Sequence, residues 1–97
     1  MESVTITRRD HGDSGEYRAK VEGSPHFGRL TWITREGARV VEHTIVPPEI
    51  GGRGIAAQLV QALIKDARAQ QFRIVPECSY VAAAFAKHPE WADLRAA

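Results

Sequence analysis

Hydrophobic and polar residues alternate along the first part of the chain. Val4 and Ile6 alternate with polar neighbours, and the pattern continues over 16–21, where the apolar positions are Tyr17, Ala19 and Val21. A period of two is typical of half-buried β-strands. Residues 11–15 separate the two stretches and have the composition of a turn, since they contain two glycines, an aspartate and a serine. The sequence therefore predicts an antiparallel hairpin.

Two further strands follow a Gly-Ser-Pro break at 23–25. Residues 27–35 alternate again, and the Glu-Gly pair at 36–37 suits a tight turn. The fourth strand is expected over 38–46. It ends at the Pro-Pro pair 47–48, because proline has no N–H for the ladder and holds its predecessor in an extended conformation. These stretches predict a meander of four antiparallel strands.

The period of the pattern changes at Gly54. Apolar residues then recur every three or four positions, at Ile55, Leu59, Val60, Leu63, Ile64 and Ala67. This spacing predicts an amphipathic helix over 54–71. Residues 72–75 form a short apolar run closed by Pro76, which predicts a fifth strand buried on both faces. A helix between two strands makes them parallel, with a right-handed crossover.

The C-terminal part is alanine-rich. Residues 80–87 predict a second helix that ends at His88-Pro89, and residues 91–94 are expected to pack a last turn against the sheet. Trp32 and Trp91 are expected in the core or at its edge. The elements predict one domain over 1–97 of the α+β class, bordering on α/β. It consists of an antiparallel four-stranded meander, then a βαβ unit with a parallel fifth strand and a C-terminal helix.

Composition limits the class of protein. The 97 residues are 43% hydrophobic and 26% charged, as in ordinary globular proteins, and so short a chain is expected to place a site in a surface cleft. A net charge of +1 predicts no nucleic-acid partner. No apolar run approaches the ~18 residues of a membrane span, so no membrane association is expected. The single cysteine and the absence of a signal-peptide pattern favour a reducing, cytoplasmic location.

A glycine-rich segment, 47–56, precedes the long helix. The first amides of a helix lack intrahelical partners and lie at the positive end of its dipole, so a glycine loop here suits an anion. Arg53 adds a positive charge. The segment matches neither the dinucleotide pattern Gly-x-Gly-x-x-Gly nor the phosphate loop that ends in Gly-Lys-Ser/Thr. The alternative is that the glycines only make a tight turn between strand and helix.

Residues 52–56, Gly-Arg-Gly-Ile-Ala, resemble the pyrophosphate-binding motif of GNAT-superfamily N-acetyltransferases, written Gln/Arg-x-x-Gly-x-Gly/Ala. Three further blocks, 43–47, 74–81 and 88–91, are similar to the short, single-domain YjdJ-type branch of that superfamily. The resemblance spans roughly residues 16 to 94. It implies a minimal GNAT-like fold and transfer of an acetyl group from acetyl-CoA, the cosubstrate, to an amine of a small molecule or a protein lysine.

The resemblance also implies which residues bind coenzyme A. The loop amides would hold the pyrophosphate, and the end of the fourth strand would bind pantetheine through its backbone; these residues are Ile45, Val46, Gly51, Gly52, Arg53, Gly54, Ile55 and Ala56. Two positions depart from the family pattern. Gly51 lies where the motif has Gln or Arg, and Ala86 lies where larger members carry a tyrosine acid. These departures favour an alternative function as a weakly catalytic CoA- or acyl-CoA-binding module, or as a protein-interaction domain.

Cys78 is the candidate nucleophile. It follows the fifth strand at the start of the second helix, where free amides and the helix dipole stabilise a thiolate and lower its pKa. A thiolate can take the acetyl group of a thioester and pass it to an amine. The alternative is that Cys78 is simply a small buried hydrophobic residue.

His43, on the fourth strand, is the candidate base, because a histidine titrates near neutrality and its strand should neighbour the fifth. Strand alternation turns Glu42 to the opposite face. Tyr80 is a candidate proton donor. The alternatives are a hydrogen-bonded histidine on a sheet face and an aromatic residue packed under the sheet.

No metal site is expected. His11, Asp13 and Glu16 lie close together in sequence, but they lack the paired Cys or His spacing of metal ligands and are typical of a solvated turn. The acid-to-base balance does not select among a polyamine, a protein lysine and a small metabolite as acceptor, and the pattern does not indicate an oligomeric state.

Overall fold

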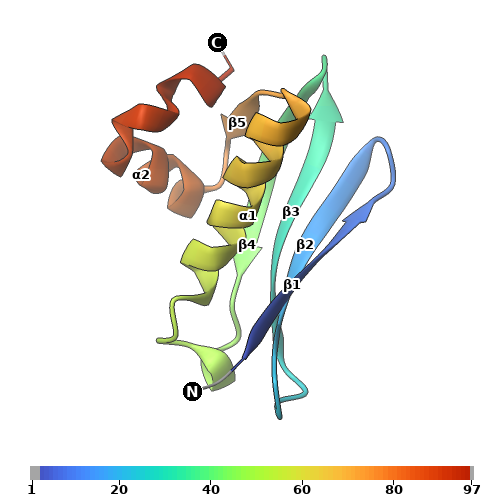
Figure 1. Cartoon of the computed structure of the whole chain (residues 1–97), viewed down its shortest axis with the longest axis vertical. Coiled ribbons are helices and arrows are strands. Elements are labelled where there is room, and N and C mark those ends of the chain that lie inside the picture. Colours follow the sequence, from blue (N-terminus) through green and yellow to red (C-terminus); the bar gives the residue numbers. More distant parts are fainter. Residues whose placement is uncertain (1–2, 97) are drawn as a thin grey trace.

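The computed structural model describes residues 3–96. Its elements, in chain order, are β1 (Val4–Asp10), β2 (Ser14–Val21), β3 (Phe27–Arg35), β4 (Ala38–Ile45), the 3-10 helix η1 (Pro48–Ile50), α1 (Ile55–Gln70), β5 (Ile74–Pro76), α2 (Ser79–Lys87) and the 3-10 helix η2 (Pro89–Leu94). Figure 1 shows their arrangement. Within this part of the chain, no helix is long and apolar enough to cross a membrane.

The five strands form one mixed sheet in the order β1-β2-β3-β4-β5. The first four pair antiparallel, and β5 pairs parallel to β4. The parallel pair arises because α1 carries the chain back along the sheet before β5 begins. The predicted α+β fold, a meander followed by a βαβ unit and a C-terminal helix, is therefore confirmed.

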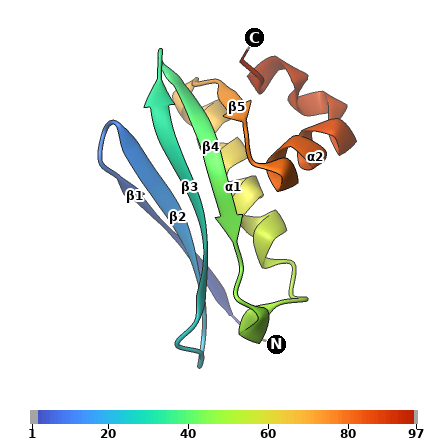
Figure 2. The same ribbon diagram turned by 180° about the vertical axis from the view of Figure 1, so that it is seen from behind.

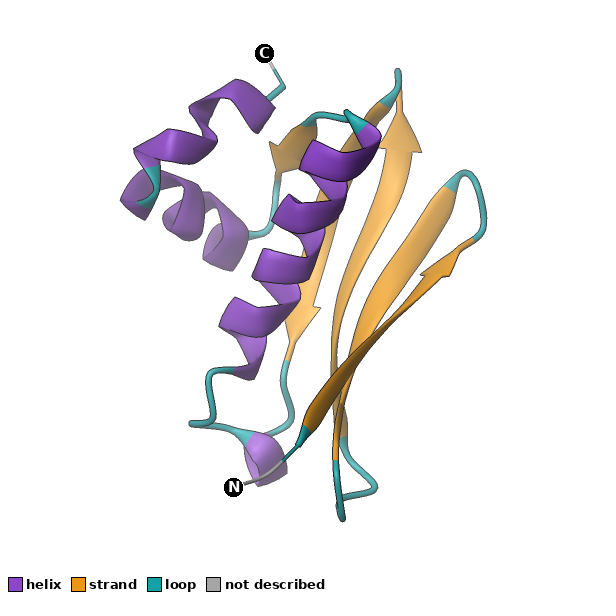
Figure 3. Ribbon diagram, viewed as in Figure 1, coloured by secondary structure: helices purple, strands orange, loops and turns teal. Residues whose placement is uncertain are grey.

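The helices cover only one face of the sheet (Figures 1 and 3), and in Figure 2 the strands lie in front of α1 with no helix over them. We call the uncovered side the open face. Antiparallel partners share a face and successive residues alternate, so the register assigns residues to each side. Leu30 and Trp32 are buried toward α1, whereas Phe27, Arg29 and Thr31 lie on the open face.

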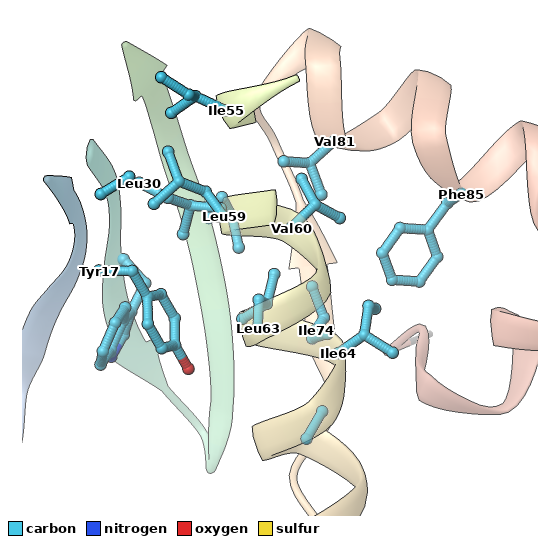
Figure 4. Packing of buried hydrophobic residues seen from close by; sticks show 14 of the residues in the cluster. Tyr17, Leu30, Ile55, Leu59, Val60, Leu63, Ile64, Ile74, Val81 and Phe85 are labelled. Atoms are coloured by element: carbon cyan, nitrogen blue, oxygen red, sulfur yellow. The ribbon is translucent and has the colours of Figure 1, made fainter. Parts of the chain in front are cut away.

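The core lies between the sheet and α1, whose predicted apolar stripe faces residues such as Tyr17 (Figure 4). α2 and η2 extend this core, because Phe85 and Trp91 are buried with their ring centroids 5.5 Å apart in an edge-on contact. Burial of each such large apolar side chain stabilises the fold by about 1.5–3 kcal/mol. Trp32 and Trp91 are both core residues, as predicted.

The fifth strand differs from its prediction. β5 begins at Ile74 rather than at Phe72, whose ring instead packs on the guanidinium of Arg39, 4.0 Å from the ring centroid. Pro76 does not close the strand but pairs with β4 as its last residue, which an edge strand tolerates. The prediction of burial on both faces is also wrong. Val75 keeps partial exposure because no layer covers the open face.

A buried arginine joins the sheet to α1. Arg39 is 7% exposed, and its guanidinium donates to the Tyr17 hydroxyl (2.9 Å) and to the Asp10 carboxylate (3.2 Å) while lying over the Trp32 ring. The Tyr17 hydroxyl donates in turn to Asp66 of α1 at 2.7 Å. Burial, and then the hydrogen bond to Asp66, raise the pKa of Tyr17, so the phenol stays a neutral donor. The buried charge is thus paired with a carboxylate and lies between two aromatic rings.

Candidate active site

The two parallel strands separate soon after they meet. Their register joins β4 to β5 only as far as Val41, and the backbone N–H of Cys78 then donates to the Val41 carbonyl at 2.9 Å. β4 continues to Ile45 with no β5 residue beside it among residues 3–96. The strands therefore diverge into a split, and backbone groups of β4 along the split are left for another partner.

A β-bulge interrupts β4 at this split. Trp32 pairs with Val41 and Thr31 pairs with His43, so Glu42 is an extra residue without a partner in β3. Bulges re-aim side chains and are common beside functional sites. The regular alternation from which Glu42 and His43 were assigned to opposite faces does not hold here.

Cys78 lies at the edge of the split, as the residue before the first turn of α2. Its thiol is partly buried, and Sγ lies 3.5 Å from the Thr44 hydroxyl oxygen. Burial alone raises the pKa of the Cys78 thiol, but hydrogen bonds from Thr44 and from the amides of Val81 and Tyr80 outweigh it, so the pKa is lowered. The predicted lowering of the Cys78 pKa is confirmed in direction.

His43 and Cys78 lie on different sides of the sheet. Thr44 pairs with Leu30 and faces the helices, where it meets Cys78, whereas His43 pairs with Thr31 and is exposed on the open face. The structure therefore brings Cys78 together with Thr44, a residue that the sequence analysis missed. Strict alternation from Val41 would have placed His43 on the helix side and Thr44 on the open face. The bulge at Glu42 reverses both assignments, and no local sequence signal marks it.

The glycine loop is open and curls toward the start of α1. Gly52 (φ 74°) and Gly54 (φ 69°) both have left-handed backbone, and a side chain at either position would meet no atom within 4 Å. Gly54 is the N-cap of α1, and no side chain caps the first amides of that helix. The Arg53 guanidinium lies against the Glu49 carbonyl oxygen at 3.4 Å. The loop thus presents amides with the positive end of the helix dipole.

Gly51, Ile45 and Val46 flank this loop. Gly51 ends η1 with a φ of −70°, a conformation open to any residue, so the turn does not require glycine there. The Ile45 side chain is 45% exposed on the open face, whereas Val46 packs against the core. Ile55 and Ala56 are the first two residues of α1, and the Ile55 side chain is buried. Their contribution to an anion site is limited to their backbone amides.

A groove of about 220 Å³ separates α1 from α2. Its walls are small and aromatic side chains together with a few polar ones, namely Ala57, Val60, Gln61, Tyr80, Ala83, Ala84, Lys87, His88 and Trp91. Tyr80 is 43% exposed here and does not pack under the sheet. Ala86 is exposed elsewhere on α2. The groove, the glycine loop and the Cys78 thiol all lie on the helix side of the sheet.

A larger, shallower hollow of about 750 Å³ lies between β1 and α1. It is lined partly by Arg8 and Asp66, which form an ion pair at 3.0 Å. None of its lining residues belongs to the split or to the glycine loop. No group of three or more His, Cys, Asp or Glu side chains that could hold a metal ion occurs among residues 3–96.

A comparison with models of protein families matches residues 16–94 to one family, described as GCN5-related N-acetyl-transferase. The match includes the split between β4 and β5, the glycine loop and all of α1 and α2.

Proposed function

Because the chain belongs to the GCN5-related N-acetyltransferase family, we propose that it transfers the acetyl group of acetyl-CoA to an amine. One observation carries the proposal. The open glycine loop and Cys78, whose pKa is lowered, both lie on the helix side of the sheet, next to the split between β4 and β5. This arrangement offers a phosphate site and a reactive group next to unpaired strand backbone. The narrower resemblance to the YjdJ-type branch stays a prediction.

In this proposal the loop binds the diphosphate of coenzyme A. The amides of 52–56, with the Arg53 charge, face the anion, and the backbone of Ile45 and Val46 bonds to the amides of pantetheine along the split. The absence of a Gln or Arg side chain at Gly51 removes one phosphate contact, so affinity is lower than the full motif would give. The groove beside Tyr80 holds the rest of the pantetheine arm.

Cys78 is the proposed nucleophile. Its thiolate attacks the carbonyl carbon of the thioester, a carbon–sulfur bond forms to Sγ, and the bond to coenzyme A breaks with release of its thiolate. The amine then attacks acetyl-Cys78, an amide bond forms, and the Cys78 thiolate leaves. Thr44 stabilises that thiolate in both steps, because its hydroxyl is at hydrogen-bond distance.

His43 is the proposed base for the amine, not for the thiol. Its exposed position on the open face suits an acceptor that approaches from that side, while acetyl-CoA binds on the helix side. A neutral imidazole can take the proton that the amine loses as the amide forms. Tyr80, in the groove, is close to the coenzyme and is the candidate donor of a proton to its thiolate.

The test is a calorimetric titration of the protein with acetyl-CoA, with two glycine variants. Gly54→Glu and Gly12→Glu both replace a glycine of positive φ (69° and 86°) that has open space around it, so their backbone strain is comparable. Only Gly54→Glu places a carboxylate at the helix N-terminus. We expect it to weaken binding by about tenfold or more, through charge repulsion, and Gly12→Glu to leave binding unchanged.

Intact-protein mass spectrometry then tests the chemistry. Incubation with acetyl-CoA should add one acetyl group to the wild type and none to Cys78→Ala, and a panel of amines should remove it as acetylated product. Acetyl transfer at the wild-type rate by Cys78→Ala would exclude the covalent route. Binding without transfer to any amine would support the coenzyme-binding module, and no binding at all would refute both.

A further inference from the structure

The open face concentrates the positive charge of the chain. The register places five basic residues on it, Arg9, Arg18, Lys20, Arg29 and Arg35, and only one acidic residue among the paired positions, Glu16. The whole chain carries +1, so the other surfaces are acidic in sum. This separation of charge follows from alternation and is invisible in the composition.

Three of these cations lack a carboxylate partner. Arg18 pairs with Glu16, and Arg35 lies 3.6 Å from Glu77, but Arg9, Lys20 and Arg29 make no ion pair with any other residue of 3–96. All three are exposed. They remain available to an anion from outside.

Two arginines also face each other. Arg18 on β2 is directly opposite Arg29 on β3, and Lys20 on β2 is diagonal to Arg29. Like charges directly opposite across two strands destabilise a sheet. Arg18 is partly balanced by Glu16 and lies over the Phe27 ring at 4.7 Å, but Arg29 has neither compensation. A bound anion between the two strands would remove this repulsion.

We propose that the open face binds an acidic, extended polypeptide segment that presents a lysine amine to His43. The proposal rests on the proposed acetyltransfer and names its acceptor class. Along β3 alone, Arg29 and Arg35 are six residues apart, which is about 20 Å in a strand, and the other cations lie on the two neighbouring strands. A surface of that extent exceeds one small anion and matches several residues of an extended chain.

His43 and Ile45 lie on the same face as the cations, so a segment held there reaches the split. A hollow of about 380 Å³ at this end combines apolar walls with Arg29 and His26. Opposite His43, the Thr31 hydroxyl oxygen has no hydrogen-bond partner among the described residues. Nearby cations also lower the pKa of an incoming ammonium, which favours the nucleophilic amine.

A nucleic acid is the less favoured anion. Sites for single strands combine basic residues with exposed aromatic rings on which bases stack. On the open face the only aromatic residue among the described strands is Phe27, and it is half-buried with the Arg18 guanidinium over its ring.

The experiment measures the fluorescence anisotropy of labelled peptides that share a central lysine and differ in their flanks, which are glutamate, glutamine or arginine. This readout needs no catalysis. We expect the glutamate peptide to bind best and to weaken with salt, and Arg29→Gln and Lys20→Gln each to reduce its affinity about two- to five-fold. The control Arg73→Gln removes an exposed arginine before β5 and should leave it unchanged.

The outcomes separate this inference from the proposed function. Equal binding of the glutamate and glutamine peptides, or tighter binding of an oligonucleotide of equal charge, would overturn the docking surface. Charge-dependent binding without acetyl transfer would keep the surface and refute the acetyltransferase. Transfer at equal kcat/KM to all three peptides would keep the enzyme and refute the acceptor class.

Discussion

The backbone N–H of Cys78 donates to the carbonyl oxygen of Val41 at 2.9 Å, and within residues 3–96 this is the last backbone hydrogen bond between β4 and the chain that follows β5. On one side of it the strands are paired; on the other they diverge. The bond therefore fixes the candidate nucleophile at the point where backbone groups become free for a substrate.

Thr44→Val tests what holds the Cys78 thiolate. The substitution keeps the shape of the side chain and removes the hydroxyl 3.5 Å from Sγ. Since that hydroxyl lowers the pKa of Cys78, its loss raises the pKa, and the rate of alkylation by iodoacetamide should reach half its plateau at a higher pH. Thr5→Val, on the distant strand β1, is the matched control. An unchanged profile for Thr44→Val would show that the helix amides alone set the reactivity.

His43→Gln separates the two halves of the proposed reaction. His43 lies on the open face and Cys78 on the helix side, so the substitution should leave acetylation of Cys78 intact and slow transfer to the amine by about 10²- to 10⁴-fold. Acetylated protein should then accumulate in intact-mass spectra. If acetylation of Cys78 slows by the same factor as the overall reaction, His43 serves the thiol instead.

Gly51→Arg supplies the side chain that the family motif has at this position and this chain lacks. The backbone at Gly51 suits any residue, and a Cβ there would lie 3.4 Å from its nearest neighbour, the Pro48 carbonyl oxygen. A guanidinium at the loop should raise affinity for acetyl-CoA about three- to ten-fold in calorimetry through a charge-assisted phosphate contact. Gly51→Ala adds no charge and should bind like the wild type; equal affinity of Gly51→Arg and Gly51→Ala would place the phosphate elsewhere.

Tyr17→Phe should change how stability depends on alkaline pH. The pKa of Tyr17 is raised in the folded chain, so its contribution is fully present below about pH 10 and declines above, where the unfolded phenol ionises. The free energy of unfolding should fall by about 1.4 kcal/mol for each pH unit above 10 from this group.

Urea denaturation at several pH values measures the effect. Near neutrality Tyr17→Phe should cost about 1–3 kcal/mol, because Arg39 and Asp66 lose a hydrogen-bond partner. Above pH 10 its difference from the wild type should shrink. Tyr80→Phe, which removes an exposed hydroxyl, should keep the wild-type pH dependence. A constant difference between Tyr17→Phe and the wild type at all pH values would contradict the prediction.

Much of the fold could be predicted because its elements differ in period. The long helix was expected over 54–71, and its two end residues prove to be left-handed caps at Gly54 and Gln71. The fifth strand was less predictable, since a short apolar run does not show where pairing starts. Phe72 belongs to that run by composition, yet its ring packs on the guanidinium of an arginine 33 positions earlier in the chain.

The candidate site was predictable in part. The glycine loop and Cys78 are marked by local sequence, because each depends on the start of a helix. Thr44 and the placement of His43 depend on a bulge, which is set by pairing between strands and leaves no trace in β4 alone. The charge of the open face can be predicted only from the register of four strands. Composition alone therefore indicated a nearly neutral surface, whereas the open face is basic.

Arg39 has a consequence for how the chain opens. Its contacts reach Asp10 on β1, Tyr17 on β2 and, through that hydroxyl, Asp66 on α1. The first hairpin therefore cannot swing away without exposing a buried charge. We therefore expect the β1–β2 hairpin and α1 to unfold as one cooperative unit. The slowly exchanging amides of β2 should lose their protection from hydrogen exchange in the same event as those of α1.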